Sequence, residues 1–204
     1  MSCVDVVIPC YKYAHFLRGC IQSVLSQDGV DVRVLIIDDC SPDNTAEIGS
    51  QLAQEDPRVE FRRHEVNRGH IATYNEGLLE WAGGDFTMIL SADDLLVPGA
   101  LRRAAKVMTD HPEVGMTFGN YLEFDADLPS EANAVRADDS YPVKIYSHAE
   151  FLAFACNRGQ TGIAAPTAVV RTEVQRRVGG YIPALPHSGD TEMWLRLSHH
   201  SGVA

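Results

Sequence analysis

Residues 4–39 read VDVVIPCYKYAHFLRGCIQSVLSQDGVDVRVLIIDD, and this stretch decides the fold. It opens with a short apolar, β-branched run at Val4–Pro9, which is typical of a buried strand. Apolar residues then recur at helical spacing from Phe16 to Leu25, and a second apolar run follows at Val32–Ile37. The stretch therefore predicts a strand, a helix and a second strand.

The same alternation continues along the chain. Strands that alternate with helices predict an α/β fold with a mainly parallel sheet and helices on both of its faces. The further strands are expected at Val59–Arg63, Phe86–Leu90 and Val114–Phe118, and the helices between them at Thr45–Ala53, Ile71–Trp81 and Gly99–Thr109.

The second half of the chain is less regular. It predicts a polar surface loop at Asp125–Tyr146, a helix that Ser147 caps, a strand at Ala164–Val170, a turn at Gly179-Gly180 and a helix at Thr191–His199. The 204 residues suit one domain with a sizeable core.

The amino-acid composition limits the classes of function that the protein could have. The formal net charge of −11 argues against nucleic-acid binding, which needs clustered Lys and Arg. An acidic chain would also bind a phosphate-bearing substrate poorly unless a metal cation mediated the contact. The five cysteines form no Cys-x-x-Cys pair, so we expect reduced thiols. We further expect no signal peptide, no transmembrane segment and a cytoplasmic location, with peripheral membrane contact left open.

Three segments fall where predicted strands end: Pro9–Tyr13, Asp38-Asp39 and Ser91–Asp94. In parallel sheets, ligands bind outside the carboxyl ends of the strands. The coincidence predicts a ligand site at that edge of the sheet.

The acidic pairs at these ends each allow two interpretations. Asp38-Asp39 could cap a helix, or its carboxylates could accept hydrogen bonds from a base or a ribose. Asp93-Asp94 could form a plain turn, but adjacent like charges favour a cation, and Mg²⁺ and Mn²⁺ prefer oxygen ligands that bridge to phosphates. We favour metal binding for this second pair.

Other residues carry similar alternatives. Arg68 could face a base carbonyl or a phosphate, or could be a surface arginine beside a helix cap. Tyr11 could offer an aromatic face to a base or pack within its loop. Asp190 stands where a helix N-cap is expected, and it is also a candidate general base for an acceptor hydroxyl.

Read together, the segments resemble the large inverting glycosyltransferase family 2, whose members have the Rossmann-like GT-A fold. The similarity covers nearly the whole chain, because five motifs occur in the family's order. They are VVIPCYKYAHFL (Val6–Leu17), LIIDDCSPDNT (Leu35–Thr45), NRGHIATYNEGL (Asn67–Leu78), ILSADDLLVPGAL (Ile89–Leu101) and GDTEMWLRL (Gly189–Leu197).

The resemblance implies an activity and a role for each matching residue. The enzyme would transfer a sugar, with inversion, from a nucleotide diphosphate donor such as a UDP-sugar to a hydroxyl of a glycan, a lipid-linked molecule or another acceptor. Divalent Mn²⁺ or Mg²⁺ would assist. Pro9 and Tyr11 would line the base pocket, Asp39 would bind uracil and Asp38 would support its loop. Arg68 would contact the nucleotide, Asp93 and Asp94 would serve the ribose and the metal, and Asp190 would be the catalytic base.

The sequence departs from the family pattern at two positions where the pattern has an acidic residue. Ser91 replaces the first acid of the aspartate motif, and Gly189 replaces the acid before Asp190. The chain also ends soon after this motif, as a fragment of a longer enzyme would. We expect residues 1–96 to hold the nucleotide and residues 97–204 to shape the acceptor side.

Three other classes of function can be checked against the sequence. A dinucleotide oxidoreductase or a sugar nucleotidyltransferase would need a glycine-rich loop after the first strand, and Pro9–Lys12 supplies none. A non-catalytic nucleotide-sugar-binding module remains the alternative.

Overall fold

The computed structural model describes residues 1–124, 142–158 and 161–204, and these residues build a seven-stranded sheet in the order β3-β2-β1-β4-β6-β5-β7. The strands are β1 (Cys3–Cys10), β2 (Asp31–Asp38), β3 (Val59–Arg63), β4 (Phe86–Ile89), β5 (Val114–Thr117), β6 (Val169–Arg171) and β7 (Gly202–Val203). β1 to β4 pair in parallel, β5 pairs with β7 in parallel, and β6 runs antiparallel to both β4 and β5. The prediction of a mainly parallel sheet is therefore confirmed.

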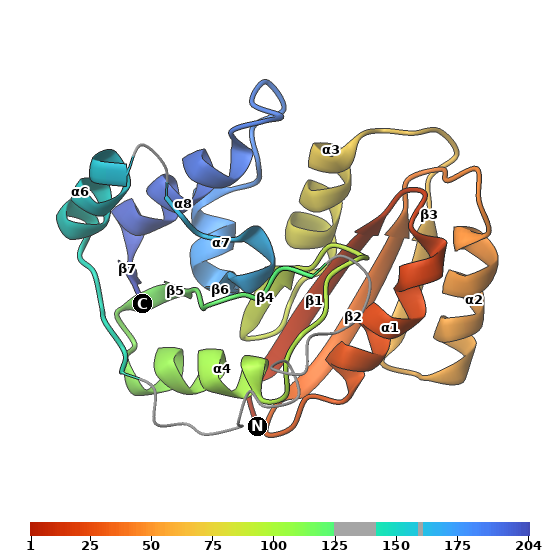
Figure 1. Cartoon of the computed structure of the whole chain (residues 1–204), viewed down its shortest axis with the longest axis horizontal. Helices are drawn as coiled ribbons and strands as arrows, with labels where there is room; N and C mark the ends of the chain where they lie inside the picture. Colours follow the sequence, from red (N-terminus) through yellow and green to blue (C-terminus); the bar gives the residue numbers. More distant parts are fainter. Residues whose placement is uncertain (125–141, 159–160) are drawn as a thin grey trace.

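Helices cover both faces of this sheet (Figure 1). They are α1 (Ala14–Leu25), α2 (Thr45–Glu55), α3 (His70–Asn75), α4 (Ala100–Asp110), α6 (His148–Arg158), α7 (Thr172–Val178) and α8 (Gly189–His200), with a π-helix η1 (Glu76–Trp81) and a short 3₁₀ turn η2 (Ala165–Thr167).

The core is divided by the sheet, because alternate residues of a strand face opposite sides. On one side, Val4, Val6 and Ile8 of β1 pack with the buried faces of α1, α2 and α4. On the other side, Val7 of β1 packs with Trp81 of η1, and a second cluster joins α3, η1, α6, α7 and α8. Burial on both faces explains why β1 and β2 read as nearly continuous apolar runs.

The fully buried Asp5 lies within this apolar arrangement. Its carboxylate accepts two hydrogen bonds from Arg33 and one each from the backbone N–H groups of Gly83 and Gly84. Burial alone would raise the pKa of Asp5, but these donors outweigh it and hold the pKa below its ordinary value. Asp5 thereby ties β1 to β2 and to the turn that leads into β4.

The carboxyl ends of β1, β2 and β4 lie at one edge of the sheet. Asp39 N donates to Cys10 O at 3.0 Å, and Leu90 N donates to Val7 O at 3.0 Å, so the loops that follow the three strands leave side by side. The segment between α7 and α8 projects beside α3 in Figure 1, and His70 Nε2 lies 3.1 Å from Pro186 O. The motifs therefore share one edge, as the sequence predicts.

Some predicted elements differ from those observed. The predicted helix Ile71–Trp81 is α-helical only to Asn75 and continues as η1, where Ala82 N donates to Gly77 O five residues back. The predicted strand Ala164–Val170 is instead η2 followed by β6, because Pro166 lacks the N–H that a central strand would use. The sequence reading missed α7 and β7. Most of the predicted loop Asp125–Tyr146 lies outside the described residues.

The Ser147 cap is confirmed. Ser147 and Glu150 hydrogen-bond reciprocally at the start of α6, in the arrangement of a capping box. Across the described ranges 1–124, 142–158 and 161–204, every helix is too short or too polar to cross a bilayer.

Candidate active site

The end of β1 and the loop after it contribute Pro9 and Tyr11. Lys12 adopts a left-handed backbone conformation (φ 67°), and its N–H donates to Ser41 Oγ at 3.1 Å, which joins this loop to the one after β2. Tyr11 is 40% exposed, with Lys12 Nζ 5.0 Å from the centroid of its ring, and Pro9 is half-buried. The contact with a base remains a prediction.

Asp38 is fully buried and organises the loop after β2. Its carboxylate accepts a hydrogen bond from Ser41 N at 2.8 Å, and the guanidinium of Arg63 lies 3.3 Å from its other oxygen. These contacts join Asp38 to the loop after β2 and to β3, and its role in nucleotide binding stays a prediction.

Asp39 anchors the loop between β3 and α3. Oδ1 accepts from Arg68 N at 2.7 Å and lies 2.7 Å from His64 Nδ1, and Oδ2 accepts from Gly69 N at 2.8 Å. Burial alone would raise the pKa of Asp39, but the hydrogen bonds from Arg68, His64 and Gly69 lower it. The carboxylate is thus kept ionised, and Oδ2 retains capacity for one more donor.

His64 was missed in the sequence reading, although it directly follows a strand at the same edge. Its buried ring bridges two acids, because Nε2 lies 2.9 Å from Glu76 Oε2 while Nδ1 faces Asp39. The guanidinium of Arg68 donates to the same Glu76 oxygen at 2.9 Å and is about half exposed. This network holds Arg68 at the rim of the site.

Asp93 and Asp94 follow β4 at the site edge. Asp93 is exposed and Asp94 is half-buried. Burial and then the charge of Asp93 raise the pKa of Asp94, although a hydrogen bond from Ser91 acts in the opposite sense. Within the described part of the chain, neither carboxylate has an ion-pair partner, so their combined charge is left for another cation.

The donor chemistry of this pair fits a divalent cation that a ligand helps to bind. The described residues hold no group of three His, Cys, Asp or Glu side chains arranged to bind a metal. Mg²⁺ is usually bound by one or two carboxylates together with substrate phosphates, and Asp93 and Asp94 match that pattern.

Asp190 lies in the first turn of α8. The alternative interpretation, in which Asp190 is the N-cap, is excluded because Ser188 occupies that position. Burial raises the pKa of Asp190 above its ordinary value, and a hydrogen bond from Tyr181 and the charge of His70 partly offset that rise. The next acid on the helix, Glu192, forms an ion pair with Arg196, with an N–O distance of 2.6 Å.

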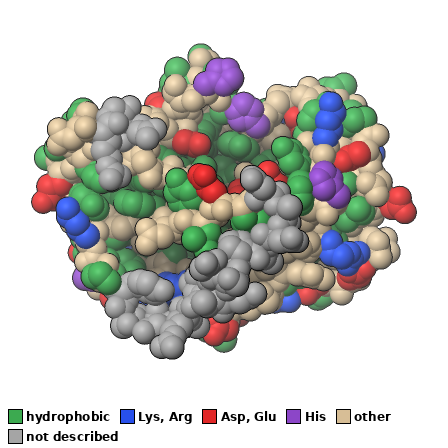
Figure 2. Space-filling view, in the orientation of Figure 1, with side chains coloured by type: hydrophobic (Ala, Val, Ile, Leu, Met, Phe, Trp, Pro, Cys, Tyr) green, Lys and Arg blue, Asp and Glu red, His purple; other side chains and the backbone are tan. Residues whose placement is uncertain are grey.

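The pKa of Tyr74, on α3, is affected by two carboxylates of the site. Burial raises the pKa of Tyr74, and the negative charges of Asp190 and Asp93 raise it further. In Figure 2, acidic side chains gather near the centre of the face, with hydrophobic and histidine side chains around them and Lys and Arg toward the margins.

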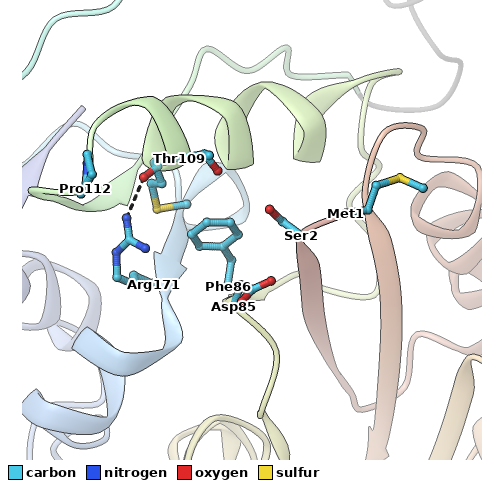
Figure 3. Close-up of a pocket in the computed structure, with 8 residues that line it drawn as sticks. Met1, Ser2, Asp85, Phe86, Thr109, Pro112 and Arg171 are labelled. Atoms are coloured by element: carbon cyan, nitrogen blue, oxygen red, sulfur yellow. Dashed lines mark hydrogen bonds between the residues drawn. The ribbon is translucent and has the colours of Figure 1, made fainter.

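A separate pocket lies at the other end of the sheet. It has a volume of about 470 Å³ and is lined by residues such as Ser2, Asp85 and Phe86, at the amino ends of β1 and β4 (Figure 3). Its arginine, Arg171, already donates to the carbonyls of Met108 and Val114. The pocket is thus remote from the clustered carboxylates.

Comparison with solved structures shows the fold class of the protein. A mannosyltransferase from Pyrobaculum calidifontis, in complex with GDP-Man and Mn²⁺, matches 98% of this chain and 53% of its own, with a TM-score of 0.71 and 19% identity. S. aureus TarS residues 1–349, in complex with UDP, match 100% of this chain and 58% of their own, with a TM-score of 0.72 and 17% identity. The fold is that of the GT-A glycosyltransferases.

Sequence comparisons then identify the family. The model of glycosyl transferase family 2 matches residues 5–164, and the chain belongs to that family. The uncharacterized protein MT1568 of Mycobacterium tuberculosis is 28% identical over 98% of this chain, and chondroitin synthase of Pasteurella multocida is 35% identical over 50%. The chain spans 63% of the first relative's length and 10% of the second's.

Proposed function

We propose that the protein transfers a sugar, with inversion, from a UDP-sugar to an acceptor hydroxyl in the synthesis of a polysaccharide or glycoconjugate. The observation that supports this proposal is that the loops after β1, β2 and β4 leave the sheet at one edge, and that the segment leading into Asp190 contacts α3 there through Pro186 and His70. A donor-binding acid, Asp93, and a candidate base, Asp190, from motifs about a hundred residues apart, would then serve one site at the sheet edge.

The nucleotide would lie across the ends of β1, β2 and β4. Tyr11 would stack on the base beside Pro9, and the free acceptor capacity of Asp39 Oδ2 would take a uracil N3–H. Arg68, which Glu76 holds at the rim, would face the nucleotide. The same fold holds UDP in one solved relative and GDP-mannose in another, so the preference for uracil rests on Asp39.

Asp93 and Asp94 would hold Mn²⁺ or Mg²⁺ against the donor diphosphate. When bound, the cation supplies neutralising charge for the departing phosphate oxygens. The uncompensated charge of the two carboxylates supports this role, as does the net charge of −11, which would otherwise repel the donor.

Asp190 would act as the general base. The acceptor hydroxyl attacks the anomeric carbon from the side opposite the diphosphate, and its proton passes to a carboxylate oxygen of Asp190 as the new C–O bond forms. The bond to the diphosphate breaks with its electron pair, so the configuration at carbon inverts. The raised pKa of Asp190 brings the base closer to neutral pH, which suits proton transfer.

The test compares Asp190→Asn with the unmodified protein. Asn keeps the shape of the side chain but accepts no proton, so UDP release from UDP-glucose or UDP-N-acetylglucosamine with Mn²⁺ should fall by roughly 10²–10⁴-fold. Calorimetric binding of UDP should stay unchanged. Glu192→Gln is the matched control, because that acid is paired with Arg196, and it should retain turnover.

Two outcomes would count against the proposal. Near-normal turnover by Asp190→Asn would remove the base from Asp190. Binding of UDP-sugars by the unmodified protein without hydrolysis or transfer would instead identify a non-catalytic nucleotide-sugar-binding module.

A further inference from the structure

A buried histidine lies where the loops after β2 and β3 meet. His64 directly follows β3, and its N–H donates to Asp38 O at 2.9 Å, so its backbone is fixed to the end of β2. Its ring lies between Asp39, which follows β2, and Glu76, the first residue of η1. The sheet therefore holds this ring between two elements of the site.

Both ring nitrogens of His64 have an acidic partner. Nδ1 lies 2.7 Å from Asp39 Oδ1, and Nε2 lies 2.9 Å from Glu76 Oε2. An ionised carboxylate can only accept hydrogen bonds, so both contacts are satisfied when both nitrogens carry hydrogen. The ring is then a cation between two acids, and it supplies the counter-charge that buried carboxylates need.

Glu76 extends this bridge to Arg68. Its Oε2 also accepts a hydrogen bond from Arg68 Nη1 at 2.9 Å, and that nitrogen lies 3.4 Å from His64 Nε2. Arg62 Nη1 lies 3.6 Å from the other oxygen, Oε1. Because His64 and Arg68 share one carboxylate oxygen, the place of that oxygen sets where the guanidinium lies.

The Asp39 end of the bridge is fixed as closely. Oδ1 accepts from Arg68 N as well as facing the imidazole, and Oδ2 accepts from Gly69 N. The two backbone donors hold the loop to the carboxylate. The imidazole also contacts Glu76, so it joins the carboxylate of Asp39 to the side chain of Arg68.

We propose that His64 is a positioning residue for nucleotide recognition: Nδ1 orients the Asp39 carboxylate for the base, and Nε2, through Glu76, fixes the Arg68 guanidinium. Both arms of this bridge rest on the proposed roles of Asp39 and Arg68 in binding the UDP donor. The two contacts with the nucleotide thus depend on one imidazole, and a change of that ring weakens either or both.

Two conservative variants separate the arms. The amide nitrogen of asparagine stands as many bonds from Cα as Nδ1, and that of glutamine as many as Nε2. His64→Gln should keep the contact with Glu76 and release Asp39. The preference for UDP over GDP, measured by calorimetry with Mn²⁺, should then fall by roughly three- to tenfold, the range of one hydrogen bond.

The arm to Arg68 is tested by a double-variant cycle. His64→Asn should keep the contact with Asp39 and release Glu76, which lowers UDP affinity. Adding Arg68→Ala should then cost less than it costs in the unmodified protein, because the two residues act together. Glu76→Gln, which leaves the ring in place, is a second variant for this arm and should show the same non-additivity.

His111→Gln is the matched control. His111 follows α4 and precedes Pro112, which lines the pocket at the opposite end of the sheet. Its substitution should change neither the affinity for UDP nor the preference over GDP. Melting temperatures of all variants would be measured alongside, so that a loss of stability is read separately from a loss of binding.

The results separate this role from a structural one and from the proposed function. Equal losses of UDP and GDP binding in His64→Gln, together with losses that multiply independently in the Arg68 cycles, would overturn the positioning role. If the unmodified protein has no preference for UDP, the base contact of Asp39 fails, whereas the Arg68 cycles still test the ring. If it binds UDP but transfers no sugar, only the transferase proposal fails, because every measurement on His64 is one of binding.

Discussion

At the residue scale, Asp39 combines a structural and a binding role in one carboxylate. The carboxylate already accepts hydrogen bonds from three groups in the segment between β3 and α3. Removing it would therefore loosen the loop that carries Arg68. A fall in UDP affinity alone would therefore have two explanations. The choice of base separates them, because a loosened loop weakens every nucleotide, whereas a lost acceptor for N3–H weakens only a base that presents that donor.

We therefore predict that Asp39→Ala lowers the affinity for UDP by about tenfold or more, since a charge-assisted hydrogen bond contributes roughly 1.5–3 kcal/mol. Affinity for GDP should fall less, so the preference for UDP should shrink when both are measured by calorimetry with Mn²⁺. Asn67→Ala is the matched control, because it removes a loop contact to the Asp39 carbonyl and leaves the carboxylate intact. Equal losses for UDP and GDP would limit Asp39 to the loop.

At the element scale, the change from α3 to the π-helix η1 is linked to close packing on β1. Gly77 is buried, and a Cβ added there would overlap the side chain of Val7. The helix can lie this close to the sheet only because residue 77 has no side chain. The approach sets the position of α3, which carries His70, Tyr74 and Asn75 into the site.

We predict that Gly77→Ala destabilises the protein by about 1–3 kcal/mol, although alanine is the better helix former, because the core must shift to admit the methyl group. Urea unfolding followed by circular dichroism would measure this loss. Gly83→Ala is the control, since a Cβ there would meet nothing closer than 3.7 Å. A Gly77→Ala variant as stable as the control would show that η1 moves freely against β1.

At the scale of the whole molecule, the acidic character must be reconciled with an anionic donor. The formal net charge is −11, and Asp93 and Asp94 add local negative charge where the diphosphate would lie. Repulsion of this kind is overcome when a cation stands between the two sets of oxygens. Metal binding and donor binding should therefore be strongly coupled.

We predict that UDP affinity, measured by calorimetry with Mn²⁺, collapses when EDTA is added and returns with Mn²⁺ or Mg²⁺. Asp93→Asn and Asp94→Asn should each weaken the metal-dependent binding. Asp110→Asn makes the same charge change at the end of α4, away from the site, and should have little effect. If UDP binds equally with and without EDTA, neither Asp93 nor Asp94 binds a metal for the donor.

Much of this architecture follows from local sequence patterns. Apolar runs and helical spacings predict β1 to β5 and the helices that separate them, because burial repeats at intervals that each element imposes. The acidic segments after β2 and β4 predict a site at the sheet edge, since parallel strands place their carboxyl ends together. The sequence by itself thus determined the fold class, the edge at which the site lies, and the segments that contribute to it.

Tertiary structure alone decided which side chains within those segments meet. His64 bridges Asp39 and Glu76, which are 25 and 12 residues away. The periodicity of a local sequence pattern cannot predict such a contact. The ring of Tyr181 lies over Gly189 because Asn75, 106 residues away, holds its backbone. β7 is only two residues long and exists through its pairing with β5. Contacts between distant residues depend on how whole elements pack, and that packing is settled only when the chain folds.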